Sequence, residues 1–309
     1  MTYLNPFHLI GQDLDANASI DKTMLRRLKK RMLSEFELLG ETTISIAEKE
    51  MDKDAVLKFF DRLEREDALK YHFEIYNNKP LLDFLEKGDP TFFKLPNSFE
   101  KLVENKPLFQ FILPYFLPHF NEILHTAVRK MDTRMINLLS KNAQHIPKQK
   151  EGIAYLRTYH YLRARVADLG AIGKKLERAH VFDSEIIDFL HPTFLANFNI
   201  LPSPYFDRIR DEYALKLETV ALNLHNKARR TSLAIEALEA GLELTLSENA
   251  AHRLNHILKQ LLPKVSQKQS FGKRKERTSQ SKKIPMDTKK IIYWTLRLLF
   301  LLRLFFKRL

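Results

Sequence analysis

The chain contains no cysteine and only eight glycines among its 309 residues. The absence of cysteine excludes disulfides, thiolate catalysis and any metal site built on cysteine ligands. Because ordinary proteins hold about 7% glycine, glycine is also too scarce for glycine-rich phosphate loops or for folds dense in tight hairpins. The first twelve residues lack the basic segment and apolar core of a secretory signal, so we expect no such signal.

No enzymatic motif stands out in the sequence, and we expect a non-catalytic protein that holds no cofactor or metal. His252 and His256 have the four-residue spacing of two metal ligands on one helix face. No acidic residue close to them completes such a site, so we interpret both as surface histidines. The tyrosines and arginines of residues 155–165 could stack on nucleic-acid bases, but their spacing favours tyrosines packed inward and arginines in solvent.

Apolar residues recur at three- and four-residue intervals along most of the chain, which predicts an all-α protein. A first helix is expected from Ile20 to Leu39 with Gly40 as its stop, and further helices from Asp52 or Asp54 and over 68–76. The other side of the first helix carries five cations: Arg26, Arg27, Lys29, Lys30 and Arg31. Later helices are expected over residues 119–145, 149–180, 183–198, 205–227, 231–246 and 247–262, which suits a helical bundle or a short α-solenoid.

Composition divides the chain into five segments. Six of the thirteen prolines lie within residues 80–118 among many phenylalanines, so only short helices and ordered connections are expected there. Small residues such as Gly241 are expected where helices approach closely. The predicted segments are an N-terminal helical domain of residues 1–79, a Pro/Phe-rich connection of 80–118, a helical bundle of 119–263, a disordered basic linker of 264–288 and a membrane-associating helix of 289–309.

The net charge of +13 is concentrated at the C-terminal end of the sequence. Residues 264–309 hold 14 basic and two acidic side chains, a net charge of +12, which leaves +1 for residues 1–263. Residues 264–288 are polar, basic and nearly free of large apolar groups, so they cannot bury enough surface to offset chain entropy. A field of one sign in so short a segment indicates an anionic partner for that segment and says nothing about the fold.

Residues 289–309 form the most hydrophobic stretch, and their pattern predicts a basic amphipathic helix. The residues expected to contact a membrane share its apolar side: Ile291, Trp294, Leu298, Leu302, Phe305 and Phe306. The cations expected to contact lipid headgroups or phosphate lie on its other side and in the linker before it: Lys273, Arg274, Lys275, Arg277, Lys282, Lys283, Lys289, Lys290, Arg297 and Arg303.

The apolar core of this helix is short for a membrane span. Residues 291–306 would extend about 24 Å against a hydrocarbon thickness of about 30 Å. Apolar side chains favour insertion by about 5 kcal/mol, and Arg297 and Arg303 oppose it by about 5 to 7 kcal/mol near the bilayer centre. Because these terms roughly cancel, we expect the helix to lie on an anionic membrane or insert shallowly, with the rest of the chain at the cytoplasmic face. The alternatives are packing on the body or on a partner helix, and phosphate contacts with nucleic acid.

The N-terminal residues carry a particular order of motifs. Residues 5–38 hold an Asn5-Pro6-Phe7 turn, a short apolar segment, a polar cap and the basic helix, and residues 55–76 form a second block of helical pattern. This order resembles a J domain, a family that stimulates an ATPase heat-shock chaperone through a His-Pro-Asp triplet after the basic helix. The loop here reads Leu39-Gly40-Glu41-Thr42-Thr43, so the resemblance implies a degenerate J-like fold without that stimulation.

The five cations of the basic helix are the part of the J-like region that could still serve a function. Residues Arg26 to Arg31 would dock an acidic partner, and the alternative is a solvated charged face on an ordinary helical hairpin. The sequence as a whole therefore predicts a non-catalytic adaptor or degenerate co-chaperone at an anionic membrane surface, bound to an unidentified protein partner. The second hypothesis is a nucleic-acid-associated protein that binds phosphate through its basic C-terminal residues.

Overall fold

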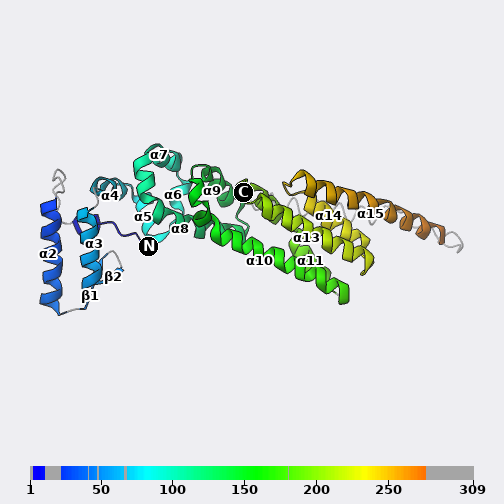
Figure 1. Ribbon diagram of the computed structural model, residues 1–309, viewed down its shortest axis with the longest axis horizontal. Helices are drawn as coiled ribbons and strands as arrows, with labels where there is room; N and C mark the ends of the chain where they lie inside the picture. Colours follow the sequence, from blue (N-terminus) through cyan, green and yellow to red (C-terminus); the bar gives the residue numbers. More distant parts are fainter. Residues whose placement is uncertain are drawn as a thin grey trace, which may run out of the picture. The chain divides into compact units, whose positions relative to one another are not determined.

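The computed structural model describes residues 3–10, 22–40, 42–46, 49–65, 68–179 and 181–275, and in this part the chain is all-α with one two-stranded sheet (Figure 1). The predicted fold class is therefore confirmed. In chain order the elements, with 3₁₀ helices written η, are α1 (Phe7–Ile10), α2 (Lys22–Leu39), β1 (Thr43–Ile46), β2 (Lys49–Asp52), α3 (Lys53–Arg65), α4 (Leu69–Tyr76), α5 (Lys79–Lys87), α6 (Thr91–Lys94), α7 (Ser98–Glu104), α8 (Lys106–Lys130), α9 (Thr133–Ala143), η1 (Lys148–Lys150), α10 (Glu151–Arg178), α11 (Asp183–Ile187), η2 (Asp188–Leu190), α12 (Pro192–Ile200), α13 (Asp207–Asn226), α14 (Thr231–Leu242) and α15 (Glu248–Lys275). Two compact units, Met1–Lys259 and Gln260–Leu309, divide the chain within α15.

Helices α2 and α3 pack on each other and are joined by the β1–β2 hairpin. Leu25, Leu28 and Phe36 of α2 and Val56 and Phe60 of α3 are buried in one cluster. The hairpin is antiparallel and pairs Thr43 with Asp52 through Ile46 with Lys49. It is absent from the predicted elements, because two four-residue strands are too short for an alternating pattern to be distinguished from a loop.

Local chemistry explains where α2 ends and where α3 begins on either side of the hairpin. Gly40 takes a left-handed conformation with φ 62°, and its N–H donates to the Phe36 carbonyl oxygen at 3.2 Å, which ends α2 as predicted. At the other end of the hairpin, the Asp52 carboxylate accepts a hydrogen bond from the Ala55 N–H at 2.7 Å. Asp52 therefore caps α3, one of the two starting points that the sequence predicts.

The Pro/Phe-rich residues 80–118 are largely helical and enclose an aromatic core. The Phe84 ring lies 4.8 Å from Phe116 and 5.1 Å from Phe93, between ring centroids. Helix α8 is 25 residues long and contains Pro114 and Pro118 in its interior, so the prediction that only short helices fit here is wrong. Both prolines are exposed, so the carbonyl groups that lose their N–H partners lie on the solvent side of α8, while its buried side packs undisturbed.

Two further helices are shorter than predicted. The expected helix of residues 119–145 is interrupted where Met131 takes a left-handed conformation with φ 55°, and Asp132 then caps α9 by accepting from the Met135 N–H at 3.0 Å. The expected helix of residues 183–198 is interrupted at His191, whose ψ of 119° is extended. Proline disfavours the helical conformation in the residue before it, and Pro192 accordingly starts a new helix.

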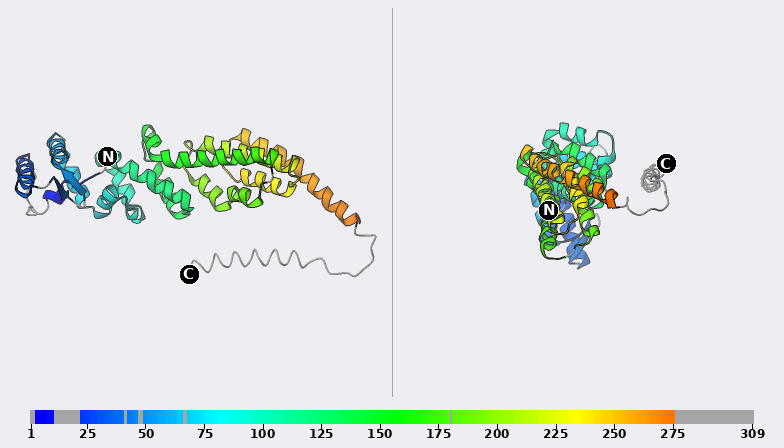
Figure 2. Two further views of the ribbon diagram at one scale, coloured as in Figure 1. Left: turned by 90° about the horizontal axis from the view of Figure 1, so that it is seen from below. Right: turned by 90° about the vertical axis from the view of Figure 1, so that its right-hand side faces the viewer.

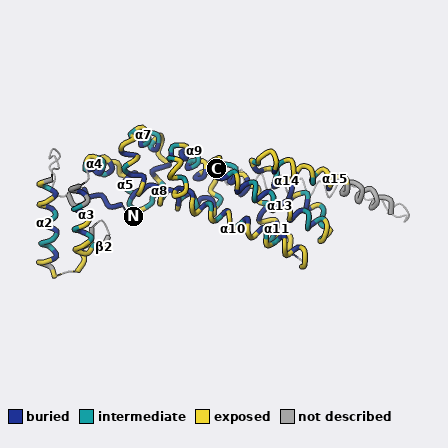
Figure 3. Tube along the Cα trace, in the orientation of Figure 1, coloured by how far each residue is buried: buried dark blue, intermediate teal, exposed yellow. Residues whose placement is uncertain are grey.

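Helices α10, α13 and α14 lie side by side (Figures 1 and 2). Helices α10 and α13 run parallel, because Arg163 in the middle of α10 pairs with Glu212 near the start of α13, and further along both helices the Asn223 amide donates to the Gly173 carbonyl oxygen at 2.9 Å. Helix α14 returns along α13. These packed helices leave α10 with one buried side and one exposed side (Figure 3).

Helix α15 continues to Lys275, so the first twelve residues of the predicted disordered linker are helical. Residues 264–275 contain one glycine and no proline, and their lysines, arginine and glutamines are good helix formers. Among the described residues, none of the helices combines the length and the apolar character of a membrane span. Residues 276–309, with the remainder of the linker and the predicted membrane-associating helix, lie outside the described residues.

Candidate docking surface on α2

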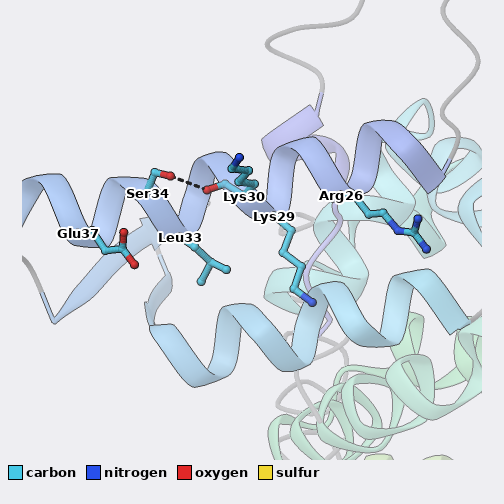
Figure 4. A pocket seen from close by; sticks show the side chains of 6 residues that line it. All are labelled: Arg26, Lys29, Lys30, Leu33, Ser34 and Glu37. Carbon is cyan, nitrogen blue, oxygen red and sulfur yellow. Dashed lines mark hydrogen bonds between the residues drawn. The ribbon is translucent and has the colours of Figure 1, made fainter.

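A shallow pocket of about 430 Å³ lies along one side of α2 (Figure 4). Its lining residues recur every three or four positions, so they form one stripe of the helix. They are Arg26, Lys29, Lys30, Leu33, Ser34 and Glu37. The pocket thus combines three predicted docking cations with an apolar, a hydroxyl and an acidic side chain that the sequence did not single out.

Contacts with α3 decide which cations in the pocket keep a free charge. Lys29 and Leu33 are partly buried and point toward α3 in Figure 4. The Lys29 ammonium lies 2.5 Å from the Asp61 carboxylate of α3. Arg26 and Lys30 are exposed and form no ion pair within the described part of the chain. Lys29 therefore holds α2 against α3, while Arg26 and Lys30 remain available to an outside anion.

The five predicted docking cations do not share one face. Each helical residue turns the side-chain direction by about 100°, which places Arg27 and Arg31 on the flank of α2 beyond Ser34, where neither lines the pocket. Both are exposed, and Arg31 lies 3.8 Å from Glu35 across one helical turn. The pocket thus contains Arg26, Lys29 and Lys30 and does not include the other two cations.

Charge changes sign along the pocket. Arg26 and Lys30 occupy the half nearer the start of α2, Leu33 lies in the middle, and Glu37 lies at the far end, 3.5 Å from the Lys53 ammonium. The Ser34 hydroxyl donates to the Lys30 carbonyl oxygen at 2.9 Å and is thereby occupied within the helix. A guanidinium offers a planar set of donors to a carboxylate or phosphate, and an ammonium adds a point charge. The arrangement suits an anion followed by an apolar side chain.

The lining residues that were not predicted could have been found from their spacing in the sequence. Leu33 and Glu37 follow Arg26 and Lys30 at helical spacing, so the stripe could have been extended from the cations. What the sequence does not contain is the Lys29–Asp61 contact, because it joins residues 32 positions apart whose approach depends on the α2–α3 packing.

Of the other predicted site residues, the structure describes only three. Lys273, Arg274 and Lys275 lie at the end of α15. The remaining predicted contacts lie outside the described residues: Arg277, Lys282, Lys283, Lys289, Lys290, Arg297 and Arg303 for headgroups or phosphate, and Ile291, Trp294, Leu298, Leu302, Phe305 and Phe306 for the membrane. His252 and His256 are both exposed. Within the described residues, no group of three or more acidic or histidine side chains could hold a metal ion.

The aromatic and cationic residues of α10 are divided between core and solvent, as the sequence favours. Tyr155 is 1% exposed, and burial raises the pKa of its hydroxyl. Arg157 is exposed and pairs with Glu122 of α8. Arg165 is the exception, since its guanidinium lies over the Phe189 ring at 4.5 Å instead of extending into solvent. These residues therefore stabilise packing and present no set of parallel rings for bases.

The chain matches no protein-family model, no curated protein and no solved structure. The resemblance of residues 5–76 to a degenerate J domain accordingly stays a prediction. The α2 pocket and the distribution of charge along the chain are the features of this protein that bear on its function.

Proposed function

We propose that this protein is a non-catalytic adaptor that docks an acidic segment of a partner protein on the α2 pocket while its basic C-terminal region holds it at the cytoplasmic face of a membrane. The observation that carries the proposal is the pair of exposed cations Arg26 and Lys30, four residues apart beside Leu33 and without an ion pair in the described part. A degenerate co-chaperone, as the J-like order of motifs suggests, would be one form of such an adaptor.

The size of these interactions predicts weak docking. Exposed ion pairs contribute about 0.2 to 1 kcal/mol each, so Arg26 and Lys30 together contribute at most about 2 kcal/mol, which is about a 30-fold gain in affinity. Leu33 adds apolar contact, and Glu37 repels a second anion at the far end of the pocket. Attachment to a membrane would compensate for the weakness, because it raises the effective concentration of a partner on the same surface.

The experiment compares two double charge reversals in the full chain. Arg26→Glu with Lys30→Glu changes the pocket, and Arg27→Glu with Arg31→Glu makes the same change in net charge on the other flank of the same helix. The probe is a fluorescein-labelled helical peptide with two glutamates four residues apart and a leucine one turn further on. Measured by fluorescence anisotropy, the pocket reversal should weaken binding about tenfold or more, because each attraction becomes a repulsion of similar size.

The flank reversal should weaken binding by less than about threefold, because neither Arg27 nor Arg31 lines the pocket and their charges act on the peptide only through solvent. Equal losses in the two variants would mean that net charge alone attracts the peptide, and the pocket would then have no docking role. Far-UV circular dichroism of both variants checks that α2 still folds.

A further inference from the structure

The outward side of α10 is apolar where a surface helix usually carries charge. The buried side, centred on Leu162 and Leu169, faces α8 and α13. Directly opposite, six exposed residues recur every three or four positions: Ile153, Leu156, His160, Ala164, Ala167 and Ala171. We call this set the α10 stripe. Ile153 and Leu156 are each 48% exposed. An uncharged outward seam of this length on an amphipathic helix is typical of a surface that another helix covers.

The α10 stripe is complementary to itself when turned end for end. Its first half carries the two large apolar residues, Ile153 and Leu156, and its second half carries alanines. A two-fold axis beside residue 162 would set Ile153 against Ala171 of a second copy and Leu156 against Ala167. Large side chains would then meet small ones along the whole seam, which allows two helices to approach at about 8 to 10 Å. A parallel pairing would instead set large against large and small against small.

Charges at the edge of the stripe support the same pairing. Arg157 and Asp168 lie on the same flank of α10, and in an antiparallel pair each flank faces the same flank of the copy. The two-fold axis that aligns the apolar residues also sets Arg157 opposite Asp168, twice per dimer. Asp168 is exposed and has no ion pair within the described residues. Arg157 pairs with the exposed Glu122, which leaves its outer donors open to a second carboxylate.

Among the other cations near the α10 stripe, Arg163 and Lys175 are paired within the chain, and the exposed Lys174, which forms no ion pair within the described residues, lies three residues beyond the last member of the stripe, Ala171. Arg163 on the other flank pairs with Glu212. Lys175, beyond the end of the stripe, lies 3.0 Å from Glu185. We therefore infer that α10 is a dimer interface on which a second copy of this chain packs antiparallel through the α10 stripe. This surface is separate from the α2 pocket, so either proposal can fail without the other.

The absence of native cysteine makes a direct test available. Two variants of the full chain, Ile153→Cys and Ala171→Cys, are treated with a short thiol-to-thiol cross-linker, first alone and then as an equal mixture. An antiparallel dimer places position 153 beside position 171 of the copy, but 153 about 27 Å from its own equivalent. The mixture should give severalfold more cross-linked dimer than either variant alone. Dimer that forms equally in all three samples, or mainly in the single-variant samples, would overturn the pairing.

A second comparison separates this interface from self-association elsewhere in the chain. Leu156→Asp, introduced into both cysteine variants, should remove the cross-link, because it places a charge in the middle of the seam. Ile187→Asp on α11 is the matched control, since Ile187 is 52% exposed and lies outside the stripe; it should leave the cross-link in place. The dimer would be contradicted if the cross-link were lost with both Leu156→Asp and Ile187→Asp, or if it were lost with neither. A wild-type chain that sediments as a monomer at about 100 μM would also contradict it.

Discussion

Within the described part of the chain, Arg210 is the one charged side chain that is fully buried, at 0% exposed. Its guanidinium donates to the carbonyl oxygens of Phe198 and Leu201 at 3.0 and 3.1 Å, and to the Ser203 hydroxyl at 2.7 Å. It thereby supplies donors to carbonyl groups at the end of α12, where the Phe198 oxygen also accepts a long hydrogen bond of 3.4 Å from the Leu201 N–H. Burial alone would raise the pKa of Asp207, but hydrogen bonds from Ser203 and Arg210 outweigh it and lower that pKa, so Asp207 stays ionised beside the guanidinium.

We expect Arg210→Ala to lower the free energy of unfolding by about 2 to 4 kcal/mol, because it removes the guanidinium donor from the Leu201 and Phe198 carbonyl oxygens and leaves a cavity behind. Urea denaturation followed by circular dichroism measures the change. Arg208→Ala, two residues away on an 89% exposed side chain paired with Glu212, should change it by less than about 0.5 kcal/mol. Similar losses in both variants would show that the buried hydrogen bonds add nothing beyond helix propensity.

At the scale of helices and strands, periodicity predicts the elements whose packing repeats their own pattern. The expected limits of α10, α13 and α14 lie within a few residues of the observed ones, because each of these helices buries one regular stripe. The differences arise where tertiary contacts decide. Pro114 and Pro118 stay within α8 because they face solvent while Phe116 is buried between them, and no local rule gives that orientation. In the candidate site, the sequence supplies the cations, but only the α2–α3 packing pairs Lys29 with Asp61.

Gly241 marks a close approach of α14 and α15, as the sequence suggests. A methyl group there would lie 2.6 Å from a Leu254 methyl carbon and 3.6 Å from Leu217, and both leucines are fully buried. Gly241→Ala should therefore cost about 1 to 3 kcal/mol by overpacking, despite the better helix propensity of alanine. In α10, Gly152 has nothing within 4 Å, so Gly152→Ala should instead stabilise the fold by up to about 1 kcal/mol. Thermal melts measure both effects: the melting temperature should fall for Gly241→Ala and rise for Gly152→Ala. Changes of the same sign in the two variants would contradict the close packing at Gly241.

For the molecule as a whole, the distribution of charge matters more than its sum. Residues 1–263 are nearly neutral at +1, and residues 264–309 carry +12. Near an anionic bilayer each such cation contributes about 1 kcal/mol, an attraction that salt weakens. The net charge of +13 is therefore almost entirely that of residues 264–309.

We expect the full chain to co-sediment with vesicles that contain phosphatidylserine, and far less with neutral vesicles, because the attraction is electrostatic. Leu298→Asp combined with Leu302→Asp should reduce the bound fraction severalfold by removing apolar contact with the bilayer. The same pair should leave binding to duplex DNA unchanged if the basic residues serve nucleic acid instead. Equal partitioning of wild type and the double variant would contradict the membrane proposal.

The most direct test of the adaptor proposal is a charge exchange across the α2 pocket. The full chain with Arg26→Glu and Lys30→Glu is titrated with a peptide in which lysines replace the two glutamates of the acidic probe, and its affinity is compared with that of the native pair by fluorescence anisotropy. Docking at Arg26 and Lys30 predicts that the lysine peptide binds the reversed pocket with an affinity within about threefold of the native pair. The chain with Arg27→Glu and Arg31→Glu should not bind the lysine peptide with a comparable affinity. Failure of the lysine peptide to bind the reversed pocket any better than the reversed flank would contradict the account.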